Sequence, residues 1–267
     1  MKDISKIDYT ALDRPEVLMF LFHPRPEPDV TSFQTAQSET RIAGREDIMI
    51  PVQEAIAIGA RFHMAEKSGG NLLFFHGNGE IVADYDELGA VYNQMGINLL
   101  AVDYRGYGRS GGKPTVTAMM QDCHIIFHFV QNWLKQNNFC GPILLMGRSL
   151  GSASVLELAA AYKNSIGGPL LALLGIDSAS LGFKEEEGFR NVDKINYFDK
   201  PTLIIHAEFD HIIPYSDGQT LYDACPSGDK KLLKISGANH NDIFMRGMQK
   251  YLAAVNEIVE LVKTTSP

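Results

Sequence analysis

The sequence predicts an α/β protein in which a mostly parallel β-sheet carries helices on both faces. Short apolar runs typical of strands buried on both faces alternate with segments whose apolar residues recur at helical spacing. No low-complexity segment or linker divides the 267 residues, and α/β domains often reach this length as one unit. Strands separated by helices favour a parallel sheet covered on both sides.

Composition agrees with this class and excludes others. Hydrophobic residues make up 45% and charged residues 21%, which predicts a large core and excludes a disordered chain. The net charge of −8 disfavours nucleic acid as a partner, because phosphate backbones repel an acidic surface. Three cysteines without metal-like spacing indicate a reducing compartment. We find no signal sequence and no apolar run of the ~20 residues that span a bilayer, so we expect a cytoplasmic protein without a membrane-spanning segment.

The first 45 residues form an N-terminal segment of unclear role. Its apolar run at 17–22 fits an edge strand, a short helix, or a surface that contacts a membrane or a partner. Packing against the core is the simplest interpretation. From residue 46 to 267 the pattern is regular and predicts one domain.

The regular region opens with a hairpin and continues as alternating strands and helices. Gly96 ends the first long helix, and Pro114 with Thr115 begins the second. A polar stretch at 180–200, with three glutamates at 185–187, interrupts the pattern. The predicted strands are 48–50, 55–63, 71–75, 97–102, 143–146, 170–176, 202–205 and 231–235, and the predicted helices are 81–95, 116–134, 149–162 and 244–262.

A Gly-x-Ser-x-Gly turn carries the candidate nucleophile. Ser149 lies between Gly147 and Gly151, with a predicted strand before the turn and a predicted helix after it. Such a turn holds its serine in a strained backbone conformation and leaves no room for larger side chains at the two glycines. The alternative is an ordinary turn in which Ser149 caps the helix. The strand and helix on either side favour the nucleophile.

A serine hydroxyl needs a base to take its proton, and the base needs a carboxylate to hold it. His240 is the best candidate base, because it lies in a small polar loop between the last strand and the last helix. His206 lies inside an apolar strand and is expected in the core. Asp210, just after that strand, is the first choice for the acid. Asp177 also follows a strand and is the second choice.

The His-Gly-Asn-Gly segment at 76–79 follows a buried strand and predicts an oxyanion site. The backbone N–H of Asn78, or of a neighbouring residue, is expected to act together with that of Leu150, which lies at a helix N-terminus. A phosphate-binding turn or a plain loop is the alternative. The segment Asp-Tyr-Arg-Gly-Tyr-Gly-Arg-Ser at 103–110 is interpreted as a structured turn with internally paired charges. His124 and His128 lie one helical turn apart without a suggested third ligand, so no metal site is expected.

Taken together, these motifs resemble the α/β-hydrolase superfamily over about residues 48–263, and most of all its intracellular serine hydrolases. The chain order Ser149, Asp210, His240 matches the order of the triad in that superfamily. The resemblance implies the α/β-hydrolase fold, with an eight-stranded, mostly parallel sheet, and hydrolysis of an acyl ester or a related bond. The family often inserts a large cap before the acid strand, and here only 180–200 is available for one.

We therefore predict a serine hydrolase that cleaves a small-molecule carboxylic ester or thioester through an acyl-enzyme, with no metal or organic cofactor. A peptidase or amidase of the same fold and a non-catalytic binding protein are the alternatives. The short cap predicts an open, shallow site that prefers short or medium acyl groups. The counter-hypothesis is that residues 1–45 fold over the site as a lid. The natural substrate and the oligomeric state do not follow from the sequence.

Overall fold

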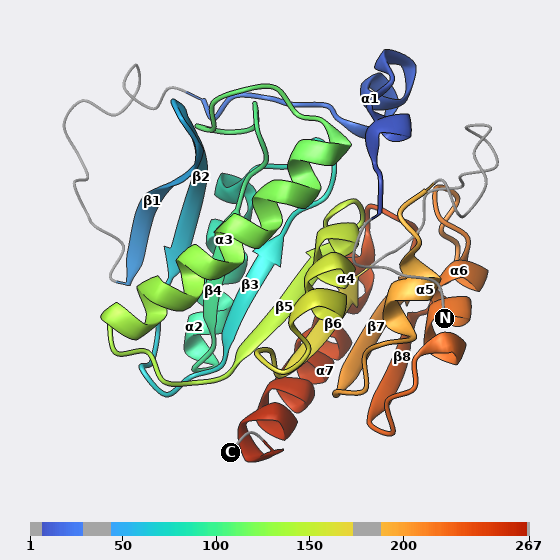
Figure 1. Ribbon diagram of the computed structural model, residues 1–267. Coiled ribbons are helices and arrows are strands. Elements are labelled where there is room, and N and C mark those ends of the chain that lie inside the picture. Colours follow the sequence, from blue (N-terminus) through green and yellow to red (C-terminus); the bar gives the residue numbers. More distant parts are fainter. Residues whose placement is uncertain (1–6, 29–43, 173–187, 266–267) are drawn as a thin grey trace.

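The computed structural model describes residues 7–28, 44–172 and 188–265 (Figure 1). The end of the strand predicted at 170–176, Asp177 and the three glutamates at 185–187 lie outside these ranges. Within the described ranges, no helix combines the length and the apolar character needed to cross a bilayer.

Eight strands form one sheet in the order β1-β2-β4-β3-β5-β6-β7-β8. β1 and β2 form the predicted antiparallel hairpin, β2 also pairs antiparallel with β4, and all other neighbours are parallel. The predicted eight-stranded, mostly parallel sheet is therefore confirmed. The strands are β1 (Arg45–Gln53), β2 (Ile56–His63), β3 (Asn71–Phe75), β4 (Asn98–Val102), β5 (Ile143–Arg148), β6 (Gly168–Ala172), β7 (Thr202–Ala207) and β8 (Lys230–Ile235).

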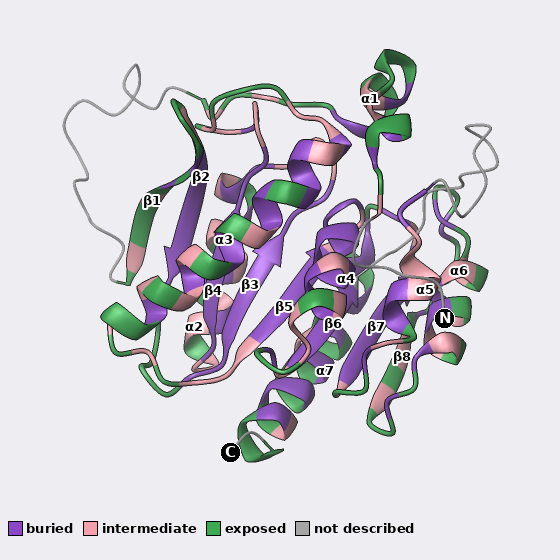
Figure 2. Ribbon diagram, viewed as in Figure 1, coloured by how far each residue is buried: buried purple, intermediate pink, exposed green. Residues whose placement is uncertain are grey.

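Helices cover both faces of the sheet because the buried strands alternate apolar side chains between two cores. Leu73 and Phe75 of β3 belong to one core, together with residues of α3, α4, α5 and α6. Leu72 and Phe74 belong to the other, together with residues of α2 and α7. Figure 2 shows the central strands buried between these layers. The helices are α2 (Asp86–Gln94), α3 (Val116–Gln136), α4 (Gly151–Tyr162), α5 (Asn191–Ile195), α6 (Tyr215–Ala224) and α7 (Ile243–Thr265).

The N-terminal apolar run at 17–22 forms a short helix, one of the three possibilities that the sequence left open. Helix α1 (Pro15–Leu21) follows the 3₁₀ helix η1 (Thr10–Asp13), and a second 3₁₀ helix, η3 (Val82–Tyr85), leads into α2. Proline at the start of α1 suits a first helical position. Val17 and Leu21 lie one turn apart and are buried in the core, as expected, whereas Met19 and Phe20 are exposed. Helices α5 and α6 were not predicted.

Candidate active site

The turn between β5 and α4 has the strained geometry that the sequence predicts. Ser149 has a φ of 49°, in the left-handed region that side chains rarely adopt. A Cβ at Gly147 would lie 2.6 Å from the Cα of Ser152, and one at Gly151 would lie 2.0 Å from the carbonyl oxygen of Phe75. Glycine is therefore required at both positions, and the turn lifts Ser149 out at the carboxyl end of the sheet.

Leu150, rather than Ser149, occupies the N-cap position of α4. Ser149 therefore does not cap the helix, which was the alternative role for this residue. The backbone N–H of Leu150 lies at the positive end of the helix dipole, which favours a negative charge beside it. This is the setting expected of an oxyanion donor.

His240 and Asp210 form a hydrogen-bonded pair although they lie 30 residues apart in the chain. The Nδ1 of His240 is 2.9 Å from the Oδ2 of Asp210, whose Oδ1 accepts the backbone N–H groups of Ile212 and Ile213 at 3.0 and 2.8 Å. Burial alone would raise the pKa of the Asp210 carboxyl, but these hydrogen bonds outweigh it and hold that pKa below its ordinary value. An ionised Asp210 has no proton to donate, so Nδ1 of His240 carries the proton and donates the hydrogen bond. Nε2 of His240 therefore keeps a lone pair, as a general base requires.

Ser149 and His240 line the same cavity of about 690 Å³. Asn78 and Leu150, the two predicted oxyanion donors, line it as well. Asp210 is bonded to the ring of His240 and its side chain is buried. The structure therefore brings the predicted site residues together at one cavity, whose volume is in the ~300–1,000 Å³ range of ligand sites.

His206 is a core histidine, as the sequence predicts. Its ring in β7 is buried, and Nε2 donates to the carbonyl oxygen of Ile213 at 3.0 Å. Burial lowers the pKa of this imidazole, which keeps the ring neutral. The same Nε2 lies 3.8 Å from the Oδ2 of Asp210, so His206 supports the loop that presents the acid.

The two histidines of α3 contact one hydroxyl rather than forming a ligand set. His124 Nδ1 and His128 Nε2 each lie 3.0 Å from the Oη of Tyr162. The described part of the chain contains no group of three His, Cys, Asp or Glu side chains arranged to hold a metal ion.

The segment at 103–110 is structured, but its charges pair with other segments and not with one another as predicted. The Oδ1 of Asp103 is 3.1 Å from the Nε2 of His76. Arg105 donates two hydrogen bonds to Asp122 of α3, at 2.7 and 2.8 Å, and Arg109 contacts carboxylates at positions 27 and 47. The motif therefore joins the edge of the sheet to α3 and to the N-terminal segment.

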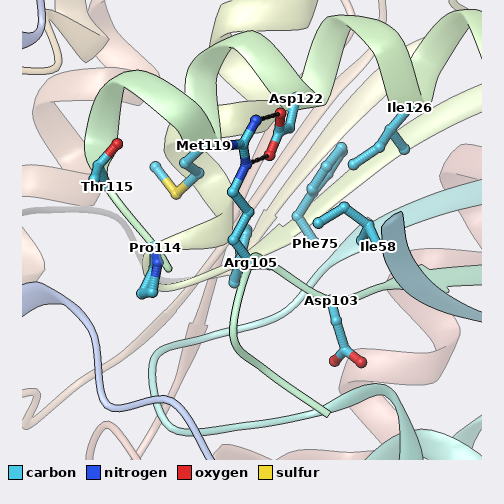
Figure 3. A pocket seen from close by; sticks show the side chains of 10 residues that line it. Ile58, Phe75, Asp103, Arg105, Pro114, Thr115, Met119, Asp122 and Ile126 are labelled. Atoms are coloured by element: carbon cyan, nitrogen blue, oxygen red, sulfur yellow. Dashed lines mark hydrogen bonds and ion pairs between the residues drawn. The ribbon is translucent and has the colours of Figure 1, made fainter. Parts of the chain in front are cut away.

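A cavity beside Arg105 is too small to be the substrate site. Figure 3 shows the fork of Arg105 on Asp122, with Met119 and Ile126 of the same helix nearby. The volume of this cavity is about 10 Å³, which is about the space that one water molecule requires. Neither Ser149 nor His240 lines it.

The N-terminal segment lines part of the larger cavity, the one that Ser149 and His240 share. From the sequence, contact between residues 1–45 and the site was only a counter-hypothesis. Phe20, Leu21 and His23 are among its lining residues. The backbone N–H of His23 donates to the side-chain Oδ1 of Asn78 at 2.7 Å, and the hydroxyl of Tyr107 donates to the same oxygen at 2.9 Å. Residues far apart in the sequence thus build one wall of the site, and no local pattern reveals such a contact.

Comparisons with known proteins agree with this architecture. Residues 66–173 match the family model described as serine aminopeptidase, S33. The human alpha/beta hydrolase domain-containing protein 17B is 32% identical over 202 residues, which cover 70% of this chain and 65% of that protein. The chain is a member of the α/β-hydrolase superfamily. It spans less than two thirds of the length of that relative and of the related protein 17C from Xenopus laevis.

Solved structures show the same fold at lower identity. An esterase from Pyrococcus furiosus superposes with a TM-score of 0.70 at 17% identity, covering 90% of this chain and 98% of the esterase. Est1E from Butyrivibrio proteoclasticus, solved with ferulic acid bound, gives a TM-score of 0.65 at 20% identity, covering 82% of this chain and all of Est1E. These likenesses show the α/β-hydrolase fold over most of the chain.

Proposed function

We propose that this α/β-hydrolase cleaves a carboxylic ester or thioester through a covalent acyl-enzyme on Ser149. One observation carries the proposal. Ser149 lies on a strained turn and shares a cavity with His240, and the Nδ1 of His240 is hydrogen-bonded to the ionised carboxylate of Asp210 at 2.9 Å. A non-catalytic binding protein has no need of this combination.

In the proposed reaction, Ser149 Oγ attacks the carbonyl carbon while Nε2 of His240 takes its proton. Asp210 orients the imidazole and stabilises the imidazolium. The N–H groups of Asn78 and Leu150 stabilise the tetrahedral oxyanion, and the imidazolium returns the proton to the leaving alcohol or thiol. Water then attacks the acyl-serine by the same route, which releases the acid and restores Ser149. No step calls for a metal or an organic cofactor.

The matched family model favours a second candidate, an aminopeptidase of the same fold. An aminopeptidase site needs a free carboxylate to bind the substrate's terminal ammonium. Among the described residues that line the cavity, Glu80 is the only acidic one, and it is paired with Arg148. The cavity's apolar residues, Phe20, Leu21 and Phe189 among them, instead suit an acyl chain. We therefore rank ester or thioester cleavage first.

A fluorophosphonate probe and two substrate series test the proposal. We expect purified protein to react covalently with the probe and to hydrolyse p-nitrophenyl esters faster than aminoacyl p-nitroanilides. Absence of both labelling and hydrolysis would show a non-catalytic protein. A reversed substrate preference would establish the peptidase. Cytoplasmic location stays a prediction.

The wall formed by α1 predicts how Phe20 affects acyl-chain preference. Phe20 lines the cavity while its side chain also remains 56% exposed, so it offers apolar surface to a long acyl group without being needed for the core. We expect Phe20→Ala to lower kcat/KM for p-nitrophenyl octanoate about 10-fold, since each buried methylene contributes ~1 kcal/mol or more. The rate on the acetate ester should change little. A series from C2 to C8 measures this.

Met19→Ala is the matched control. Met19 precedes Phe20 in α1, is 73% exposed, and is not among the cavity-lining residues. It should leave the whole series unchanged. Equal losses on acetate and octanoate in Phe20→Ala would refute a role in chain selection. An unchanged series would support the open, shallow site and a cavity wall that substrates do not use.

A further inference from the structure

An ion pair at the cavity wall connects the candidate nucleophile to the candidate oxyanion loop. Arg148 immediately precedes Ser149, and its Nη1 pairs with the Oε1 of Glu80, 68 residues earlier in the chain. Both side chains line the cavity and are largely buried, with 14% and 22% exposed. The proposed reaction assigns no chemical step to either group.

Glu80 uses its second oxygen to hold the loop that carries Asn78. The Oε2 of Glu80 accepts the backbone N–H of Gly77 at 2.7 Å and the hydroxyl of Tyr85 at 2.6 Å. Gly77 directly precedes Asn78, whose N–H is the proposed oxyanion donor. A Cβ at Gly77 would lie 2.8 Å from Glu80 Oε2 and 2.9 Å from Arg148 Nη1, so glycine lets the ion pair approach the loop.

Arg148 uses a second nitrogen to reach the base. Its Nη2 donates to the backbone carbonyl oxygen of His240 at 3.3 Å. A guanidinium can do this because it is planar and presents several donors in a fixed fork, whereas an ammonium has no such fork. One side chain therefore contacts both the oxyanion side and the base side of the cavity.

We propose that Arg148 and Glu80 form a positioning clamp that fixes the nucleophile turn, the oxyanion loop and the base loop relative to one another. The inference rests on the proposed function. Neither residue is a catalytic residue in this account, because both act through backbone groups of other residues. The contacts do not depend on which acyl group occupies the cavity.

Such a clamp affects kcat more than KM. The oxyanion forms only after attack, so a displaced N–H donor weakens the transition state and leaves substrate binding almost unchanged. Misplacement of reacting groups by about 1 Å costs roughly 10²-fold in rate. We therefore expect Glu80→Gln and Arg148→Gln each to lower kcat by about 10- to 100-fold, with KM changed less than about threefold.

The experiment measures kcat and KM on p-nitrophenyl butyrate and on a p-nitrophenyl ester of similar length with a terminal carboxylate. Arg148→Lys should retain an intermediate rate, because it keeps the charge and loses the fork. The double variant Glu80→Gln with Arg148→Gln should lose little more than the worse single variant, since both break one unit.

Arg105→Gln is the matched control for the loss of a buried ion pair. Arg105 is also 14% exposed, and it pairs with Asp122 of α3 (Figure 3). Neither of these two residues lines the cavity that Ser149 and His240 share. This variant should lose thermal stability and keep kcat. Amide hydrogen exchange on peptides covering 77–80 gives a second readout, which should become faster in Glu80→Gln and not in Arg105→Gln.

Three results would overturn the clamp. The first is an unchanged kcat in Glu80→Gln. The second is a loss confined to the carboxylate-bearing ester, which would make Arg148 a substrate-binding group. The third is an equal kcat loss in Arg105→Gln. If the unmodified protein neither hydrolyses esters nor reacts with the probe, the proposed function fails, and unchanged exchange at 77–80 in Glu80→Gln would then refute the clamp separately.

Discussion

Replacing Ser149 by alanine is expected to lower kcat for ester hydrolysis by about 10⁴- to 10⁶-fold and to abolish covalent labelling. The reason is that no other atom can form the acyl bond at the strained turn between β5 and α4. Alanine is slightly smaller than serine and fits the same space, so the fold should not change. Steady-state kinetics, probe labelling and a thermal unfolding curve measure the three expectations together.

Ser154→Ala is the control for loss of a serine hydroxyl in the same region. Ser154 lies buried in α4, and its Oγ has no hydrogen-bond partner within the described part of the chain. Removing that hydroxyl should leave labelling and kcat unchanged. Labelling that persists in Ser149→Ala would show that another serine is the nucleophile.

Replacing Asp210 by asparagine is expected to lower kcat by about 10⁴-fold. The carboxylate accepts a hydrogen bond from the Nδ1–H of His240, with a nitrogen–oxygen distance of 2.9 Å, and thereby selects the tautomer whose Nε2 has no proton. An asparagine can present its NH₂ group to Nδ1, which favours the opposite tautomer. Its side-chain oxygen can still accept the N–H groups of Ile212 and Ile213, so the loop should keep its shape.

The competing acid provides the control for this prediction. Asp177 lies outside the described residues, and Asp177→Asn should change kcat far less than Asp210→Asn. The same assay on both variants decides between them. If Asp177→Asn had the larger effect, the acid would follow the earlier strand and the Asp210–His240 pair would be structural.

Much of the sheet follows from the sequence because its strands are buried on both faces. The predicted strand at 71–75 is β3 (Asn71–Phe75), all five of whose residues are buried. A strand with water on one face would have shown a weaker apolar run. The nucleophile turn is also local, since its two glycines and its serine lie within five residues.

The candidate acid and base could be predicted for a different reason. In a parallel sheet, the loops after neighbouring strands meet at one edge, and β7 and β8 are neighbours. Asp210 follows β7 and His240 follows β8, so the topology brings them together. Asp177 also follows a predicted strand, at 170–176, which is why the sequence left two acids open. The sheet order favours Asp210, because β8 borders β7 and not β6.

Contacts between distant segments could not be predicted in this way. Glu80 and Arg148 are 68 residues apart, and His23 and Asn78 are 55 residues apart. Neither pair belongs to a periodic pattern, and an arginine inside a tight turn gives no indication of its partner. The same holds for Arg105, whose fork reaches α3 and not its own motif.

The covalent intermediate tests the central claim most directly. Brief incubation of the protein with p-nitrophenyl butyrate, acid quenching and intact-mass measurement should reveal a species heavier by one butyryl group. Peptide mapping should place that group on Ser149. Reaction with the fluorophosphonate probe provides the stable counterpart, and the account predicts its adduct on Ser149. Turnover of the ester with the probe adduct on any residue other than Ser149 would contradict the account.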